Sequence, residues 1–309
     1  MSLKLLSPLI KDIGDFDVRR VLPAAEQRAV GPFVFWDHFG PVTLTPGANM
    51  DVRPHPHIGL ATLTWLFEGE ITHRDSLGMV QDIRPGEVNW MTAGRGIVHS
   101  ERTPEARRGQ ANPMHGLQIW LGLPSDKEEI EPAFEHYPAE AIPTLVVDDV
   151  RFDLIAGEAL GVTSPVAVHS PLCYLAAELA PGQSFRWPRQ YAEQAIYLVE
   201  GALVIAGDAV PVHHMAVLPD ADEVLVHSPS GARIALLAGE PIGPRHLFWN
   251  FVSSSRERIR EAADLWADGG FDRVPGDEEF IPLPEPRRVR APESESPSDE
   301  PQAQRLGLS

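Results

Sequence analysis

The sequence predicts an all-β protein built from two β-barrels, with one short helix near the C-terminus. Its apolar runs are short, rich in β-branched and aromatic residues, and separated by glycine-containing turns, as at residues 60–67 and 68–70. The chain holds 30 Pro and 25 Gly among 309 residues, which favours a turn-rich β protein over a helical one. The segment LFEG at 66–69 also resembles LVEG at 198–201, an offset of 132 residues that suggests a repeated domain.

The first half of the chain divides into short strand-like segments. Residues 3–22 alternate weakly between apolar and polar positions and are expected to form an edge strand or hairpin. Turn-forming residues bound each of the later segments, which is typical of β-strands. These strands are expected at residues 31–41, 60–67, 71–75, 80–83, 87–91 and 115–124.

The second half begins after a polar, proline-containing segment with glutamates at positions 128, 129 and 131, which we interpret as a linker. The strands that follow are expected at residues 145–147, 151–156, 172–179, 195–199 and 216–218. Residues 245–252 are predicted to be either a last strand or an extended segment that packs back on the first barrel.

A helical pattern follows residue 253. Residues 254–257 have the S-x-x-E form of a capping box, with Ser254 as the cap. Apolar residues at 259, 262, 263 and 266 share one helical face, and Gly269-Gly270 ends the pattern. From Phe280 the chain is rich in Pro, Glu and Ser. We therefore expect an N-terminal barrel at 1–125, a linker at 126–143, a C-terminal barrel with the helix at 144–270, and a disordered tail at 271–309.

The stretch from Arg53 to Glu101 carries the candidate site. His55 and His57 lie two residues apart near its start, and His99 and Glu101 lie two residues apart at its end. Side chains alternate faces along a strand, so each pair projects from one face. If the two strands lie side by side or face each other, three imidazoles and one carboxylate converge, a set that suits iron, manganese, copper, nickel or zinc. An isolated pair of histidines would more often be ordinary surface or core residues, so the second pair carries the prediction.

Other polar residues near this stretch have plainer interpretations. Asp37 and His38 are expected to make structural hydrogen bonds, with a supporting role behind the metal ligands as the alternative. His73 is expected to be a surface histidine on the return strand, with a role in the site as the alternative. His115 and Gln118 have opposite parity, and His115 is predicted to be the one that faces the pocket.

The second barrel is predicted to bind no metal in this way. At the offset of 132 residues, Trp187 and Arg189 stand where His55 and His57 stand in the first barrel. His213 and His214 are adjacent in sequence, so they point to opposite faces and would chelate poorly.

Composition limits the partners and the compartment. The formal net charge of −18 and the sequence pI near 5.0 argue against direct binding to nucleic acid, but they leave a basic protein partner open. Cys173 is the single cysteine, which excludes an intrachain disulfide and favours a reducing cytosol. The N-terminus lacks a signal-peptide pattern, and no apolar run approaches the ~20 residues of a membrane helix. We expect a cytoplasmic monomer without membrane contact.

Four segments resemble signatures of the pirin family of the cupin superfamily: FWDHFGP at 35–41, HPHIGLAT at 55–62, WMTAGRGIVHSE at 90–101 and HGLQIWL at 115–121. The resemblance covers about residues 1–270 and is looser in the second half. It implies a bicupin, with two cupin-type barrels and one metal, usually Fe²⁺, in the N-terminal barrel. The implied metal ligands are His55, His57, His99 and Glu101.

Three functions fit this resemblance. Some pirins are similar to quercetin 2,3-dioxygenases, which implies a small aromatic substrate and O2, with Glu101 as the catalytic proton acceptor. Trp90, Phe35 and Met50 are then expected to line the substrate pocket. The alternative is a redox-sensitive regulatory protein that modulates a transcription factor or a metabolic enzyme. The third is a metal-stabilised scaffold whose site is closed by protein, which the order of loop 42–50 would decide.

Overall fold

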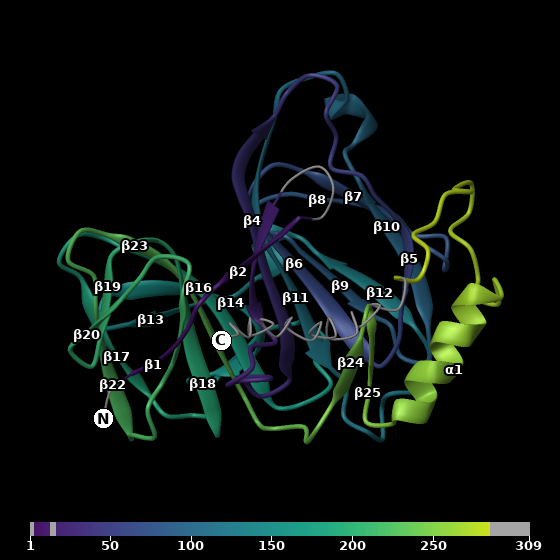
Figure 1. The fold of residues 1–309 in the computed structure, drawn as a ribbon. Helices are drawn as coiled ribbons and strands as arrows, with labels where there is room; N and C mark the ends of the chain where they lie inside the picture. The colour runs from purple at the N-terminus through teal and green to yellow at the C-terminus, as the bar shows by residue number, and fades with distance from the viewer. Residues whose placement is uncertain (1–2, 13–16, 285–309) are drawn as a thin grey trace, which may run out of the picture.

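The structure is a computed structural model that describes residues 3–12 and 17–284. Two β-barrels lie next to each other, each made of one large sheet and one four-stranded sheet (Figure 1). The predicted all-β class with two cupin-type barrels and a short C-terminal helix is confirmed. Within the described part of the chain, no helix has the length and apolar character that crossing a membrane requires.

The first barrel contains the candidate site. Its large sheet has the strand order β12-β9-β6-β11-β4-β3-β2, and its four-stranded sheet has the order β5-β10-β7-β8. The large sheet consists of β2 (Leu9–Asp12), β3 (Asp17–Leu22), β4 (Phe33–Leu44), β6 (Leu60–Glu68), β9 (Val88–Thr92), β11 (Asn112–Gly122) and β12 (Ala133–Tyr137). The small sheet consists of β5 (Val52–His57), β7 (Ile71–Asp75), β8 (Val80–Ile83) and β10 (Ile97–Arg102). One 3₁₀ turn, Glu105–Arg107, follows β10.

The second barrel is filled by apolar side chains. Its large sheet consists of β1 (Lys4–Leu6), β13 (Thr144–Val147), β14 (Val150–Ala159), β15 (Val162–Thr163), β16 (Leu172–Leu179), β18 (Glu193–Gly201), β21 (Met215–Val217) and β23 (Ala232–Gly239). Its small sheet consists of β17 (Ser184–Pro188), β19 (Leu203–Ile205), β20 (Asp208–Val210) and β22 (Glu223–His227). Phe152, Phe185 and Trp187 are fully buried in this interior.

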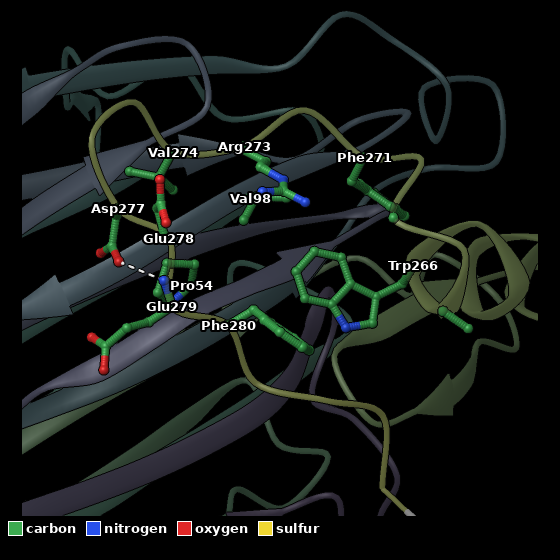
Figure 2. Close-up of a pocket in the computed structure, with 12 residues that line it drawn as sticks. Pro54, Val98, Trp266, Phe271, Arg273, Val274, Asp277, Glu278, Glu279 and Phe280 are labelled. Atoms are coloured by element: carbon green, nitrogen blue, oxygen red, sulfur yellow. Dashed lines mark hydrogen bonds between the residues drawn. The ribbon is translucent and has the colours of Figure 1, made fainter.

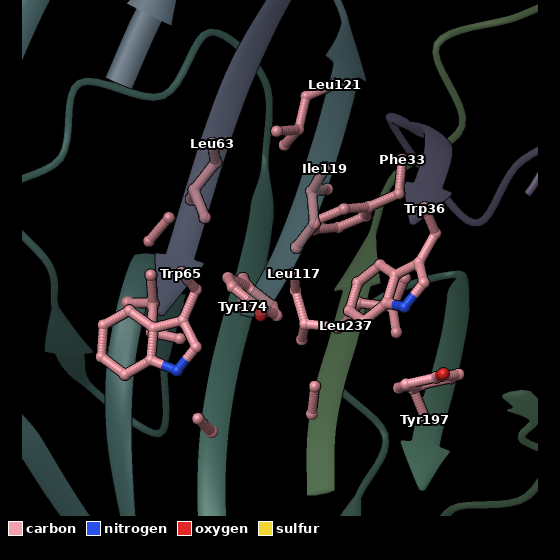
Figure 3. Packing of buried hydrophobic residues seen from close by; sticks show 14 of the residues in the cluster. Phe33, Trp36, Leu63, Trp65, Leu117, Ile119, Leu121, Tyr174, Tyr197 and Leu237 are labelled. Carbon is pink, nitrogen blue, oxygen red and sulfur yellow. The ribbon is translucent and has the colours of Figure 1, made fainter. Parts of the chain in front are cut away.

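The two large sheets pack face to face through an apolar core between the barrels. Figure 3 shows part of it, with Trp36 and Leu117 from the first barrel against Tyr174, Tyr197 and Leu237 from the second. Trp36 meets Tyr174 edge-on at a centroid distance of 5.8 Å. Aromatic pairs of this kind add to the stability gained from area burial. The barrels therefore share one of the main hydrophobic cores of the molecule.

Three segments pack outside the domain to which the sequence analysis assigned them. Strand β1 pairs with β21 of the second barrel. Strand β12, inside the expected linker, pairs with β9 of the first barrel, and a 3₁₀ turn at Ala139–Ala141 follows it. Strands β24 (His246–Phe248) and β25 (Phe251–Ser253) form a hairpin, and Phe251 bridges Ile58 of the first barrel. Of the two readings of residues 245–252, the segment that packs back is the one observed.

The helix α1 (Arg256–Ala267) is present, but its cap is one residue later than expected. Ser255 is the cap residue and accepts a hydrogen bond from the backbone nitrogen of Arg258. The expected cap, Ser254, instead donates from its backbone nitrogen and hydroxyl to the buried carboxylate of Glu128. That carboxylate also pairs with Arg245 at 3.0 Å, so the helix start is tied to the segment after β11.

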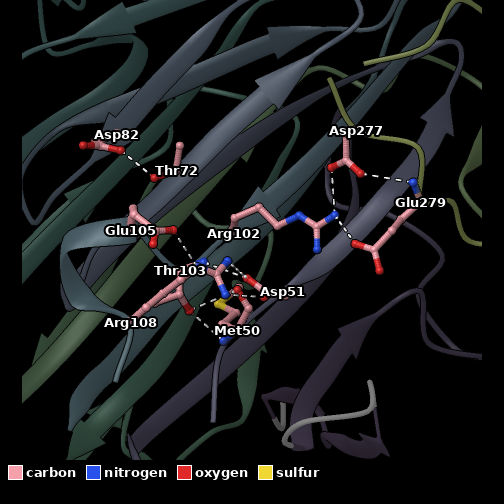
Figure 4. Close-up of polar contacts among 10 residues, drawn as sticks. All are labelled: Met50, Asp51, Thr72, Asp82, Arg102, Thr103, Glu105, Arg108, Asp277 and Glu279. Carbon is pink, nitrogen blue, oxygen red and sulfur yellow. Dashed lines mark hydrogen bonds and ion pairs between the residues drawn. The ribbon is translucent and has the colours of Figure 1, made fainter. Parts of the chain in front are cut away.

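Residues 268–284, called here the C-terminal strap, lie against the outer face of β5 and β10. The backbone nitrogen of Ile281 donates to the carbonyl of Pro54 at 2.8 Å. Arg102 donates to Asp277 and Glu279 at 2.7 Å each (Figure 4). The prediction of a disordered tail from residue 271 is therefore wrong for 271–284, while 285–309 lie outside the described residues.

A pocket of about 260 Å³ lies between the strap, helix α1 and the outer face of the small sheet. Trp266, Phe271 and Phe280 form its aromatic side, and Pro54 and Val98 form its floor (Figure 2). The floor residues are the sequence neighbours of two candidate metal ligands, which project from the opposite face of the same strands. The strap therefore supports the strands that carry the site.

Truncation tests the strap. A chain that ends at residue 284 is expected to keep the melting temperature of the full chain, because residues 285–309 are rich in Pro, Glu and Ser and lack an apolar period. A chain that ends at residue 270 is expected to lose at least about 2 kcal/mol of stability, since burial of a valine such as Val274 contributes roughly that much. Thermal denaturation of both chains checks this, and equal melting temperatures would contradict a structural strap.

Candidate metal centre

The candidate ligands come from two neighbouring antiparallel strands. Strand β5 is at the edge of its sheet, which is where a strand tolerates the prolines that flank His55 and His57. Strand β10 pairs with β5 so that His99 lies opposite His55. Of the two predicted arrangements, side by side is therefore the one observed. The candidate ligand atoms of the three histidines all lie within 4.8 Å of one another, and no other such group of His, Cys, Asp or Glu occurs among the described residues.

The turn before β10 fixes the position of His99. Gly94 has φ +50°, and a Cβ atom there would lie 2.0 Å from the carbonyl oxygen of Ile130. The carbonyl of Gly94 accepts from the backbone nitrogen of Gly59 at 2.8 Å. Only glycine fits this close approach, which explains Gly94 of the AGRG segment.

Glu101, the fourth predicted ligand, lies beside the three histidines on the same strand as His99. The register of β10 against β5 shifts between His99 and Glu101, which marks a bulge. Glu101 Oε2 lies 3.9 Å from His55 Nε2, and Glu101 Oε1 lies 3.7 Å from His99 Nε2. Both Glu101 Oε2 and His99 Nε2 are buried without a hydrogen-bond partner among the described residues. Buried polar atoms are normally paired, so two unpaired ligand atoms in one cluster fit a metal ion.

Burial sets the protonation of the cluster. It lowers the pKa of His55 to about 4, and it lowers the pKa of His57 and His99 well below 6.5, with neighbouring imidazoles adding to the effect. The three rings are therefore neutral at pH 7, the form that binds metals. Burial raises the pKa of Glu101 to about 8, and a cation bound beside it would favour the charged carboxylate.

Backbone carbonyls orient two of the rings. His55 Nδ1 lies 2.8 Å from the carbonyl oxygen of Arg53, and His57 Nδ1 lies 3.1 Å from that of Asn250. A carbonyl can only accept, so each Nδ1 carries the proton and each Nε2 keeps its lone pair. The ring of His57 also packs edge-on against Trp120 at a centroid distance of 5.0 Å.

The cavity beside His99 and Glu101 is small. Its volume is about 10 Å³, which is the space that one water molecule needs. Polar and apolar side chains of β6, β7, β8, β9 and β12 line it: Thr62, Thr64, Ile71, His73, Ile83, Asn89, Met91 and Phe134. Phe134 stacks on His73 with a centroid distance of 4.2 Å and an interplanar angle of 17°. This stack joins β12 of the large sheet to β7 of the small sheet.

The predicted pocket walls are elsewhere. Trp90 belongs to the core between the barrels, and Met91, its neighbour with opposite parity on β9, lines the cavity instead. Phe35 stacks on Trp120 with a centroid distance of 3.8 Å, and it is Trp120 that contacts the candidate ligand His57. Met50 packs in a separate apolar cluster of the first barrel.

The prediction that His115 faces the pocket is also wrong. His115 shares a face of β11 with Leu117 and Ile119, as its parity indicates, but that face points to the second barrel. Its Nε2 lies 2.8 Å from Nε2 of His38. Gln118 is on the site side and accepts a hydrogen bond from Thr64, a residue that lines the cavity.

The other polar residues have structural partners, and all but one lie as the sequence predicted. Asp37 forms a two-bond ion pair with Arg20, which agrees with the structural interpretation. His38 lies 2.8 Å from the hydroxyl of Tyr197 across the barrel interface. The exception is His73, which is buried rather than exposed, and whose ring lies against His99.

In the second barrel, the positions that correspond to His55 and His57 hold groups with other partners. Trp187 is fully buried and donates from its indole nitrogen to Gln194 at 3.1 Å. Arg189 pairs with Asp220. Elemental analysis of metal per chain would test the prediction that this barrel binds none.

Comparison with known proteins identifies both halves. Residues 15–121 match the family model described as Pirin, and residues 174–272 match the Pirin C-terminal cupin domain. The chain is 49% identical over 280 residues to a pirin-like protein of Caulobacter vibrioides, which covers 89% of this chain and 96% of that protein. It is 35% identical over 268 residues to human pirin, which covers 83% of this chain and 89% of that protein.

A solved structure of a quercetin 2,3-dioxygenase from Acinetobacter baumannii has the same fold. It superimposes with a TM-score of 0.84 at 36% identity and covers 92% of this chain and 95% of its own. The similarity therefore extends over both barrels.

Proposed function

This chain belongs to the pirin family of the cupin superfamily, and we propose that it is an iron-dependent dioxygenase that cleaves a flavonol such as quercetin with O2. The observation that carries the proposal is the buried group of three neutral imidazoles with the carboxylate of Glu101 beside it, in which His99 and Glu101 each have an unpaired atom. The relative that is solved as a quercetin 2,3-dioxygenase supports the substrate class.

The residues present suit a divalent metal held by His55, His57, His99 and Glu101. Imidazole ligands suit iron, and a fourth oxygen ligand leaves positions open for substrate on a six-coordinate ion. When bound, the metal would supply Lewis-acid stabilisation of the flavonol enolate and redox chemistry with O2. The orienting carbonyls of Arg53 and Asn250 hold two of the rings in place for this role.

Glu101 is proposed to take the proton of the flavonol hydroxyl. Its Oε2 atom is buried and has no hydrogen-bond partner among the described residues, so it is free to accept one. The cavity that Glu101 lines adjoins this carboxylate, which supports the proposed role. Proton acceptors positioned in this way typically contribute about 10²–10⁴-fold to the rate.

Entry of a flavonol requires the cavity to open. Ligand pockets for molecules of this size are roughly 300–1,000 Å³, far above the 10 Å³ present. Phe134 is the most readily displaced wall, because β12 is at the edge of the large sheet and its residues are only half-buried. We propose that displacement of Phe134 from His73 opens the route.

Phe134→Ala tests this route. The smaller side chain is expected to raise kcat/KM for quercetin several-fold, because it removes the ring that closes the cavity. Phe134→Leu is the matched control, since it keeps an apolar side chain of similar volume and should change kcat/KM less. Steady-state O2 uptake on the iron-loaded protein measures both, and a fall in kcat/KM for Phe134→Ala with unchanged metal content would argue against this entry.

The proposed activity is tested with purified, iron-loaded protein. O2 consumption, measured per bound metal, should depend on added quercetin. Protein with a full complement of iron and no flavonol-dependent O2 uptake would overturn the assignment.

The closed cavity supports a second candidate function, a redox-sensitive regulatory protein. A cavity with room for one water molecule is compatible with a site that binds no organic substrate. A formal net charge of −18 suits a basic protein partner. This candidate predicts that iron oxidation changes affinity for such a partner while flavonols leave O2 uptake unchanged. The O2-uptake experiment therefore separates the two functions.

A further inference from the structure

A fully buried carboxylate, Asp75, ends strand β7 beside the metal centre without being one of the candidate ligands. Its Oδ1 atom accepts from the backbone nitrogens of Leu77 at 2.9 Å and Met79 at 3.1 Å. Its Oδ2 atom lies 2.9 Å from Nε2 of His73. A carboxylate in this position accepts, so His73 carries its proton on Nε2 and presents the lone pair of Nδ1.

That lone pair faces a candidate metal ligand. His73 Nδ1 lies 3.4 Å from His99 Nδ1, and one proton can occupy the space between the two nitrogens. Because His73 already holds its proton toward Asp75, the shared proton belongs to His99 Nδ1. The lone pair of His99 Nε2 is then left free, and this is the buried nitrogen without a partner that lies 3.7 Å from Glu101.

We propose that Asp75 and His73 are positioning residues that hold His99 in the tautomer able to bind the metal. The inference rests on the metal centre of the proposed function but not on its substrate. His55 and His57 obtain the same orientation from backbone carbonyls, so a side-chain substitution cannot remove it. His99 obtains it from two side chains, which makes its tautomer the one that substitution can change.

Asp75→Asn tests the chain of hydrogen bonds with little change in shape. The amide oxygen can still accept from Leu77 and Met79, but the amide NH2 then faces His73 Nε2 and donates to it. His73 must move its proton to Nδ1, and His99 must move its own to Nε2, the proposed ligand atom. Affinity for Fe²⁺, measured by anaerobic competition with a chelator, is expected to fall about 10–100-fold.

Two substitutions of His73 separate positioning from packing. Both His73→Leu and His73→Asn lose the ring that stacks on Phe134. An asparagine oxygen at the place of Nδ1 can accept from His99 Nδ1, whereas leucine cannot. Fe²⁺ affinity is therefore expected to be close to wild type for His73→Asn and about 10–100-fold weaker for His73→Leu. Equal losses in both variants would overturn the proposal in favour of packing.

The tautomer itself is read in the metal-free protein by ¹⁵N chemical shifts of the histidine rings. Wild type is expected to show His99 protonated on Nδ1, and Asp75→Asn is expected to show it protonated on Nε2. A wild-type His99 protonated on Nε2 would overturn the proposal. If the tautomers and Fe²⁺ affinities are as expected but quercetin is not turned over, the proposed substrate is rejected and the positioning role still holds.

Discussion

His57→Ala and His99→Ala are each expected to leave the purified protein without stoichiometric metal. Each histidine is one of the four proposed protein ligands, and structural metal sites in zinc proteins have a binding free energy on the order of 10–16 kcal/mol. Loss of one of four ligands is expected to weaken binding on the order of 100-fold, if the four contribute about equally to that free energy. Elemental analysis after dialysis against a weak chelator measures the effect.

His214→Ala is the matched control, because His214 is a histidine of the second barrel whose Nδ1 contacts the carbonyl of Val212. That variant should keep the metal content of wild type. Full metal occupancy in His57→Ala would show that the metal binds elsewhere. Substitution also removes the contact between His57 and Trp120, so the metal-free forms of wild type and variant should be compared for stability.

Local periodicity explains why the site was predictable. The residues of a strand alternate between two faces, so His55 with His57 and His99 with Glu101 could each be assigned to one face from sequence alone. The sequence left open whether β5 and β10 pair or face each other, because pairing depends on contacts across the whole barrel. The bulge between β5 and β10 beside the site was also not predictable, since it appears only as a register shift.

The same periodicity does not tell which face is the interior. His115 has the parity of Leu117 and Ile119, and that face of β11 is buried against the second barrel rather than in the first. Both faces of β11 are buried, so hydrophobicity could not distinguish them. Trp90 and Met91 on β9 present the same problem, with the larger apolar side chain directed to the barrel interface.

Composition was a poor guide to order in the segment that follows the helix. Residues 271–284 contain several charged residues, which resemble a solvated tail, but Asp277 and Glu279 pair with Arg102 of β10. Long-range ion pairs of this kind leave no periodic signal in the sequence. His73 was missed for a similar reason, because its partners Asp75 and His99 become informative only once β7 and β10 are seen to be neighbours.

Glu101→Gln is expected to separate catalysis from metal binding. Glutamine keeps the shape of the side chain but removes its charge and its ability to take a proton. Three imidazoles should retain some metal, since His55, His57 and His99 already converge within 4.8 Å. Turnover with quercetin is expected to fall by at least ~100-fold per bound metal, the low end for a general base.

The measurement is O2 uptake with quercetin divided by the metal content of the same sample, for wild type and Glu101→Gln. Normalisation removes the weaker metal binding that loss of a carboxylate ligand produces on its own. If Glu101 only holds the metal, the two proteins turn over equally per metal, and the proton-accepting role is rejected. If Glu101 takes the substrate proton, the variant stays slow even when added iron restores full occupancy, because neither the histidines nor the glutamine amide can replace the carboxylate as base.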